Sequence, residues 1–174
     1  MTPDDFRTFY PHLIGWIHQT LGAYAKEANT IASLGFPRLP RYFSPELLAS
    51  TNVVAVERLP IPPLSSMGLS GFAEFDHGDY AGITYLNTFF VKRRSAAIER
   101  LHFHELIHVI QWRLLGPEAF LATYADGLET FGYRNSPLES MAYDAEASFC
   151  QSDQPFDAAN LVAEQLSRMQ GIEQ

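Results

Sequence analysis

The sequence predicts an α+β protein: one amphipathic helix, then a small antiparallel sheet, then a second half made of helices. Apolar side chains recur every three or four residues up to Tyr24, which is typical of a helix. β-Branched and aromatic residues concentrate between positions 51 and 91, where proline and glycine interrupt them, as in strands. From Ser95 onward the helical spacing returns. With 174 residues, of which 47% are hydrophobic, we expect one domain spanning residues 1–174.

The N-terminal helix is predicted from about Pro3 to Ala32 and is expected to pack on the rest of the protein through one apolar face. Its histidines, His12 and His18, are six residues apart and point to different sides, so we do not expect them to share a metal ion. The apolar face comprises Phe6, Tyr10, Leu13, Ile14, Ile17, Leu21 and Tyr24.

A short second helix is predicted in "SPELLAS". Ser44 can cap it, Pro45 suits the first helical position, and Glu46 favours the positive end of the helix dipole. A strand is predicted next, at residues 51–59, because this run is rich in β-branched residues and ends before prolines.

Two further strands are predicted at residues 71–75 and 80–91, joined by a turn in "DHGD". Together with the strand at 51–59 they are expected to form the antiparallel sheet. His77 lies in the turn, where an exposed histidine is more common than a metal ligand.

Four helices are predicted in the second half, at about 95–115, 117–131, 136–150 and 156–169. Gly116 is a natural terminator for the first of them, and Pro117 can open the next. Cys150, the one cysteine, excludes an intramolecular disulfide and is expected to be a small buried core residue.

Composition argues against two classes of partner. A net charge of −8 would repel a nucleic acid, and the only cationic run, Lys92 to Arg94, is too short to counter it. No stretch is apolar enough for a membrane span, and the first residues lack a signal-peptide pattern, so we expect a cytoplasmic protein.

The stretch "HELIH" carries the chemistry. Residues four apart are neighbours on a helix face, so His104 and His108 can reach one metal ion, while Glu105 lies about 100° round and can address a water beside it. The surrounding helix is apolar nearly all round, so these groups should be buried, where a metal would satisfy them. Imidazole ligands favour Zn²⁺. The alternative is a pair of hydrogen-bonded core histidines with a salt-bridged glutamate.

Histidine 102 is excluded from this site. It lies about 200° round the helix from His104 and cannot share the same ion. Gln111 does share the face of His104, so it either lines the cleft or bonds a backbone group nearby.

Glu139 is the best candidate for a third ligand, because it borders the apolar stripe of the helix predicted at 136–150. Glu146, seven residues on, lies on nearly the same side and is the reserve. One alternative stays open for Glu139: with Ser136 it forms the pattern of a capping box, in which it would only bond a backbone N–H.

Residues 100–147 resemble the zincin metallopeptidases, specifically the gluzincins. "HELIHVIQWRLLG" with "GYRNSPLESMAYDAEA" is similar to small bacterial zincin-like proteins and, more loosely, to the metallopeptidase-like core domain of contractile injection systems. The resemblance implies a zincin-like fold and a zinc-dependent hydrolase of peptide or protein substrates. It implies His104, His108 and Glu139 as zinc ligands and Glu105 as general base.

The sequence departs from the gluzincin pattern in one respect. Many gluzincins carry an aspartate about four residues after the ligand glutamate, and it orients a zinc-binding histidine; here that place holds Tyr143, and Asp144 lies on another side. Tyr143 and Tyr133 can each donate a hydrogen bond to an oxyanion, or serve as core residues.

Two functional classes follow from these observations. As a peptidase, the protein would hold an extended peptide against an exposed sheet edge within residues 82–91. The alternative is a zincin-like module that binds metal without catalysis, in a structural, toxin or immunity role.

Overall fold

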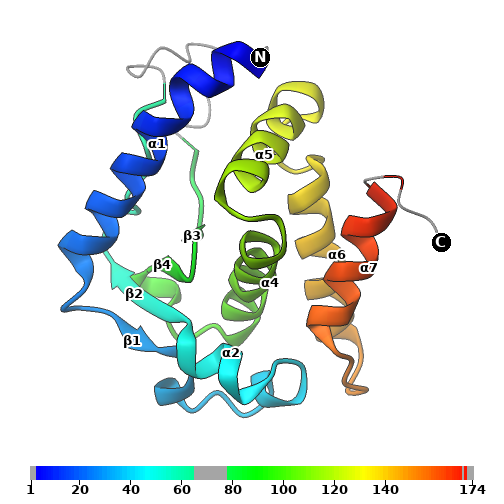
Figure 1. Cartoon of the computed structure of the whole chain (residues 1–174). Coiled ribbons are helices and arrows are strands. Elements are labelled where there is room, and N and C mark those ends of the chain that lie inside the picture. The colour runs from blue at the N-terminus through cyan, green and yellow to red at the C-terminus, as the bar shows by residue number, and fades with distance from the viewer. Residues whose placement is uncertain (1–2, 65–77, 170, 172–174) are drawn as a thin grey trace.

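The computed structural model describes residues 3–64, 78–169 and 171. These residues form an α+β structure with six helices and four strands, as the sequence predicts (Figure 1). The elements are α1 (Pro3–Tyr24), β1 (Asn29–Thr30), α2 (Pro45–Ser50), β2 (Asn52–Val56), β3 (Gly82–Tyr85), β4 (Thr88–Lys92), α4 (Glu99–Leu115), α5 (Pro117–Phe131), α6 (Pro137–Gln151) and α7 (Ala158–Met169).

The first helix is shorter than predicted. It ends at Tyr24, the last residue of its apolar stripe, rather than near Ala32. Asn29 and Thr30 form β1 instead and pair antiparallel with β2. Asparagine and threonine are weak helix formers, and pairing with β2 gives their backbone groups partners that a frayed helix end would lack.

The sheet is mixed, so the prediction of an antiparallel sheet is wrong. Its strand order is β1-β2-β4-β3. The central β2–β4 pair is parallel, and the outer pairs β1–β2 and β4–β3 are antiparallel. The reason is topological: β3 precedes β4 in the chain but takes the edge, which leaves β4 beside β2 and in the same direction. The edge position of β3 places one long side of this strand outside the sheet.

The predicted strand at 80–91 is in fact a hairpin. β3 and β4 are joined by Leu86 and Asn87, and Leu86 has a φ of 58°, in the left-handed region that disfavours a leucine. The Leu-Asn pair lacks the glycine of common two-residue hairpins, so the sequence gives no sign of the turn. The predicted strand at 71–75 and the residue His77 lie outside the described residues.

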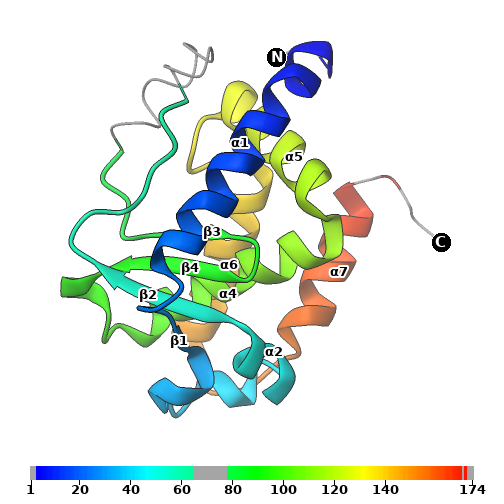
Figure 2. The ribbon, with the colours of Figure 1, turned by 60° about the vertical axis from the view of Figure 1, so that its left-hand side comes forward.

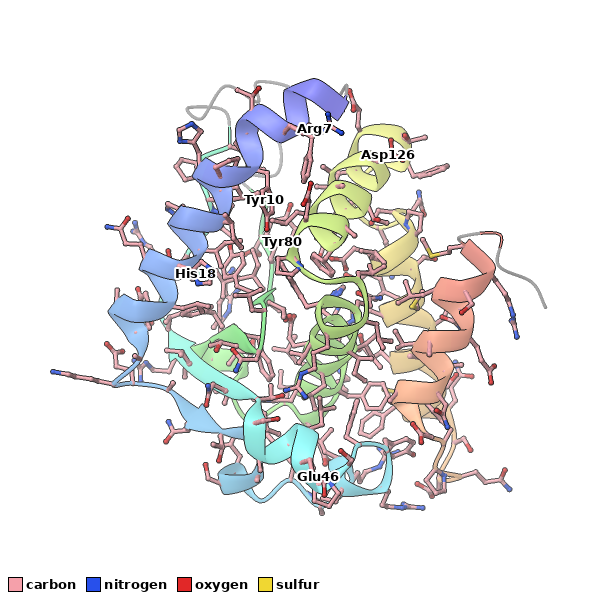
Figure 3. All side chains as sticks on the ribbon, viewed as in Figure 1. Arg7, Tyr10, His18, Glu46, Tyr80 and Asp126 are labelled. Atoms are coloured by element: carbon pink, nitrogen blue, oxygen red, sulfur yellow. The ribbon has the colours of Figure 1, made fainter. Side chains whose placement is uncertain are left out.

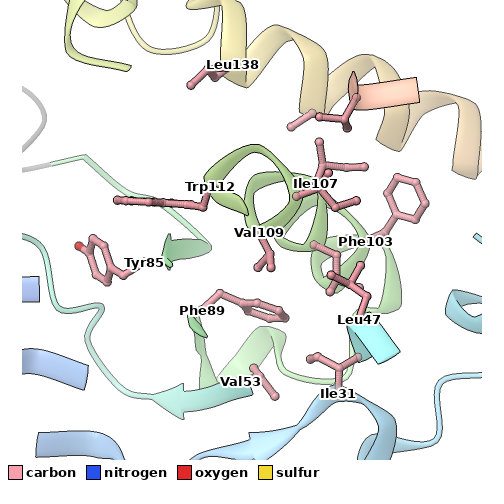
Figure 4. Close-up of a cluster of buried hydrophobic side chains, with 14 of the residues drawn as sticks. Ile31, Leu47, Val53, Tyr85, Phe89, Phe103, Ile107, Val109, Trp112 and Leu138 are labelled. Carbon is pink, nitrogen blue, oxygen red and sulfur yellow. The ribbon is translucent and has the colours of Figure 1, made fainter. Parts of the chain in front are cut away.

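The sheet lies between α1 and α4. On one face, Trp16 and Tyr24 of α1 pack against Tyr85 and Phe90, with ring centroids 5.6 and 5.2 Å apart. On the other face, Val109 of α4 points towards Phe89 of β4 (Figure 4). The helices α6 and α7 lie beyond α4, away from the sheet, whereas α5 lies at one end of α4 and contacts α1 (Figures 1 and 2). All residues from His102 to Trp112 are buried, so α4 is the central helix that its composition predicts.

The helix boundaries follow the predicted signals closely. The Ser44 side chain accepts a hydrogen bond from the Leu47 amide at 3.2 Å and caps α2. Gly116, at a φ of 77°, ends α4, and Pro117 opens α5. The start of α4 is four residues later than predicted, because a 3-10 turn occupies residues 93–95. None of the described helices is both long and apolar enough to cross a membrane.

Cys150 is exposed, so the prediction of a buried core cysteine is wrong. Its neighbour Phe149 takes the core position instead, at 1% exposure. Adjacent residues on a helix differ by about 100° in direction, so Cys150 lies outside the apolar stripe to which Phe149 belongs.

Candidate metal centre

The helix α4 brings the two histidines of the motif together as predicted. His104 and His108 are both 5% exposed, and their Nε2 atoms lie 3.2 Å apart. The separation of four residues puts both rings on the same face of the helix. Two imidazole nitrogens that close, in a buried place, need a cation between them or a proton on one of them.

Glu139, at the start of α6, completes the group. Its Oε2 lies 3.5 Å from His104 Nε2, and its Oε1 lies 3.4 Å from His108 Nε2. Ligand atoms of the three residues all fall within 4.8 Å of one another, so the group can hold a metal ion. Glu139 Oε2 is buried and accepts no hydrogen bond from the described residues, which leaves a lone pair for such an ion.

The capping-box alternative for Glu139 is wrong. Ser136 is the N-cap residue of α6, but its side chain makes no capping hydrogen bond, and its Oγ is buried without a partner among the described residues. Glu139 is 2% exposed and faces the imidazoles.

Glu146 has a different role from the reserve ligand that the sequence predicts. Its Oε2 lies 3.1 Å from Nδ1 of His104, on the side of the ring away from the Nε2 atoms, and its Oε1 accepts from Arg100 at 2.7 Å. It therefore orients His104. The residue four after Glu139, Tyr143, packs its ring on His104 at 4.7 Å. Asp144 is exposed. The orienting carboxylate is thus present, seven residues after Glu139.

Gln111 orients the second histidine. Its Nε2 donates to the Leu138 carbonyl at 3.0 Å, which can only accept, so its Oε1 faces Nδ1 of His108 at 2.8 Å. His108 must then carry its hydrogen on Nδ1, as His104 does towards Glu146. Both histidines, when neutral, direct the lone pair of Nε2 towards Glu139 and towards each other.

The carboxylates of the group favour a positive charge at the two imidazoles. Burial alone would lower the pKa of His104, but the nearby Glu139 carboxylate and a hydrogen bond to Glu146 outweigh it and raise that pKa to about 10. The pKa of His108 is raised too, against its burial, by the Glu139 carboxylate. Burial would raise the pKa of Glu139, but the two histidines hold it far below its usual range. Without a metal, the group retains a proton.

Glu105 lies beside this group and is held by β3. Its Oε2 accepts a hydrogen bond from Thr84 Oγ1 at 2.7 Å. A Cβ atom at Gly82 would lie 2.4 Å from Glu105 Oε1, so the glycine leaves the space that the carboxylate occupies. Burial raises the pKa of Glu105, although the neighbouring histidines and Thr84 oppose this. A buried carboxylate with a raised pKa is suited to take up and release a proton near neutral pH.

Several tyrosines lie at the group or its cavity, and only Tyr133 and Tyr143 were predicted from the sequence. Tyr124 of α5 donates its hydroxyl to Glu139 Oε1 at 2.7 Å, and nothing in its local sequence signals this. Tyr133 and Tyr143, the two predicted donors, lie near each other. The ring of Tyr133 packs on Tyr80 at 4.7 Å between centroids, and Tyr80 lies between α1 and α5 (Figure 3). Tyr133 lines a cavity at the group, whereas Tyr143 packs on His104.

Three other histidines stay outside the site. His102 points to the far side of α4, as predicted, where its Nε2 donates to the Ala96 carbonyl at 2.8 Å and its ring packs on Phe36. His12 and His18 are both exposed on α1.

A cavity of about 80 Å³ lies at the group and is also lined by β3. Glu105, His108 and Glu139 line one end of it, and side chains of α1, β3, α4 and α5 form the walls. The described residues thus combine a buried group that can hold a metal ion with a carboxylate able to carry a proton beside it. No protein-family model matches the sequence, and no curated protein or solved structure shows significant similarity to it. The function is therefore inferred from the geometry of the site.

Proposed function

We propose that the protein is a zinc-dependent metallopeptidase of the zincin kind. The observation that carries the proposal is that His104, His108 and Glu139 direct ligand atoms to one point, while Glu105 stands next to that point. Structural zinc sites use four protein ligands, whereas catalytic sites use three and leave a position open. A set of three beside a cavity favours the catalytic kind.

The separations within the set support zinc. Metal–ligand distances of about 2.0–2.2 Å at tetrahedral angles put two ligand atoms about 3.3–3.6 Å apart. Here the two histidine Nε2 atoms lie 3.2 Å apart, and His104 Nε2 lies 3.5 Å from Glu139 Oε2. Tyr124 occupies Glu139 Oε1, which favours binding through Oε2 alone. Bound there, zinc would polarise a carbonyl group and lower the pKa of a water molecule.

Glu105 is the proposed general base. Thr84 holds its Oε2, so Oε1 is the atom free to accept a proton from water and later deliver it to the leaving amine. Gly82 leaves room for this atom, as the Cβ distance above requires. The hydroxyl of Tyr133, in the cavity wall, is the proposed donor to the developing oxyanion.

The edge of β3 is the proposed seat of an extended peptide. The Lys92 amide bonds the Ala81 carbonyl, so in the antiparallel alternation Gly82 and Thr84 direct their backbone groups away from β4. Trp112 Nε1 already donates to the Thr84 carbonyl at 3.2 Å, from that outer side. The amide and carbonyl of Gly82 have no partner among the described residues and are the groups proposed to bind a substrate.

The test compares Glu105→Gln with the wild type. We expect both proteins to bind one zinc ion per chain, measured by metal analysis after dialysis, because Glu105 is not in the ligand set. The variant should lose peptide hydrolysis by about 100-fold or more, the usual contribution of a general base. Zinc binding without hydrolysis in either protein would instead favour the non-catalytic module, and equal hydrolysis in both would contradict the role of Glu105 as general base. Absence of zinc from the wild type would contradict both functions.

A further inference from the structure

The cavity beside the metal centre has walls of one chemical kind. Apart from Glu105, His108 and Glu139 at its inner end, its described lining contains no charged side chain, neither lysine nor arginine nor a further carboxylate. The polar hydroxyls of Thr84 and Tyr124 are turned to Glu105 and Glu139. The hydroxyl of Tyr85 donates to the Pro60 carbonyl, and that of Tyr133 is the proposed oxyanion donor; the remainder of the wall is apolar or aromatic.

Two helices from different parts of the chain contribute most of this apolar wall. From α1 come Phe6, Phe9, Leu13 and Ile17, which are buried against it. Phe6 and Ile17 are three helical turns apart, about 16 Å along the axis. The opposite wall comes from α5, and it comprises Phe120, Leu121, Ala125 and Leu128. The cavity is therefore elongated, and α1 covers it along much of its length.

The position of the cavity links it to the bond that would be cut. Gly82, Ile83 and Thr84 of the edge strand line it, and so do Glu105 and His108. A peptide lying along β3 with its carbonyl at the metal centre would have an adjacent side chain directed into this space. A volume of about 80 Å³ is several times what one water molecule needs, and an apolar cavity of this kind binds an apolar group readily.

We propose that this cavity is a specificity pocket that receives a large apolar side chain, aromatic or long aliphatic, next to the scissile bond. The inference rests on the proposed peptidase function and names its substrate class. A lysine or arginine side chain would be desolvated there without a partner other than the carboxylates that the metal centre uses, and an acidic one would meet those same carboxylates.

The experiment measures binding of three hydroxamic acids to the zinc-loaded protein by calorimetry. Acetohydroxamic acid carries only a methyl group, 3-phenylpropanohydroxamic acid carries an aromatic group, and 3-aminopropanohydroxamic acid carries a cation. We expect the aromatic compound to bind roughly 10- to 100-fold more tightly than the methyl compound, from the burial of its ring. The cationic compound should bind no more tightly than the methyl compound.

A variant tests whether the aromatic group of the hydroxamate binds inside the pocket. In Ala125→Phe, substitution of a wall residue fills the cavity and should reduce binding of the aromatic hydroxamate about tenfold or more while leaving acetohydroxamate unchanged. The matched control is Thr130→Phe, an exposed position of the same helix, which should change neither. Should Ala125→Phe fail to fold by near-UV circular dichroism, Leu128→Ala replaces it. That change enlarges the cavity and should improve binding of a naphthyl hydroxamate relative to the phenyl one.

The outcomes separate the two proposals. If acetohydroxamate binds and the aromatic compound gains nothing, the pocket is wrong and the metal centre stands. If neither binds although zinc is present, the open coordination position is wrong, and the pocket proposal falls with it. If Thr130→Phe weakens the aromatic compound as much as Ala125→Phe does, the effect is not that of the cavity and the pocket is overturned.

Discussion

Two buried histidines lie on opposite sides of α4, and their environments shift the imidazole pKa in opposite directions. On the side of the sheet, His102 is 1% exposed and packs between the rings of Phe36 and Phe89. Burial lowers its pKa. On the side of α6, His104 is almost as buried, yet the carboxylates of Glu139 and Glu146 raise its pKa to about 10. Burial thus sets the cost of a charge, and the partners decide whether the charge is kept.

The largest change should come from removing the carboxylate that distinguishes the two sides. Glu139→Gln takes away a ligand and the main negative charge facing both Nε2 atoms. We expect zinc affinity to fall more than about 100-fold, beyond the range for losing an outer partner. The pKa of His104 should fall towards that of a histidine in an apolar environment. Competition with a chromophoric chelator and histidine NMR titration measure the two effects; affinity within tenfold of the wild type would contradict the ligand role.

A smaller loss is expected when an orienting residue is removed. Glu146→Ala leaves the three ligands but frees His104 Nδ1. Zinc affinity should fall roughly 10- to 100-fold, as for other partners of metal-bound histidines. The control is Asp144→Ala, an exposed acid on the same helix, which removes the same charge without the contact. Equal losses in both variants would point to net charge rather than orientation.

Thr84→Val tests how the strand holds Glu105. In the wild type, the hydrogen bond from Thr84 lowers the pKa of Glu105. Without this bond the pKa should rise, and the acid limb of kcat/KM should move to higher pH. At neutral pH we expect about a fivefold lower kcat/KM, the equivalent of one hydrogen bond. Thr84→Ser keeps the hydroxyl and should restore the wild-type profile. An unchanged acid limb in Thr84→Val would show that the hydrogen bond does not tune Glu105.

The smallest expected effect concerns the apolar side of α4. Because the folded-state pKa of His102 lies below its ordinary 6.5, the unfolded chain binds more protons at acid pH. Its contribution to stability is therefore present above about pH 6.5 and is lost as the pH falls below that value. Between pH 7 and 5, the free energy of unfolding of the wild type should decrease more than that of His102→Gln, by at most about 1.4 kcal/mol per pH unit. Urea unfolding of both proteins measures the difference, and parallel curves would contradict it.

The elements that local patterns specify were predictable. The helix carrying His104, Glu105 and His108, its end at Gly116 and the start of the next helix at Pro117 all follow from spacing and backbone preference. The sheet was less predictable, because the relative direction of two strands depends on which strands pair with each other. Neither the parallel β2–β4 pair nor the turn at Leu86 has a signature in neighbouring residues.

The site residues that could be predicted are those whose role depends on neighbouring residues of the same helix. Glu139 was found as a ligand candidate, but the sequence could not separate that role from a helix cap, because both are compatible with its position at the start of α6. Thr84 and Tyr124 carried no signal at all, since their hydrogen bonds to Glu105 and Glu139 cross between separate elements.

The sequence by itself determined which groups share one face of α4, because the helical repeat fixes the direction of residues one and four apart: His104 and His108 together, Glu105 beside them, His102 away. Only the tertiary structure decided which partners those groups meet. The packing of α6 brings Glu139 between the imidazoles and puts Glu146 behind His104, and β3 holds Glu105. These contacts join residues tens of positions apart, so their geometry depends on how whole elements pack.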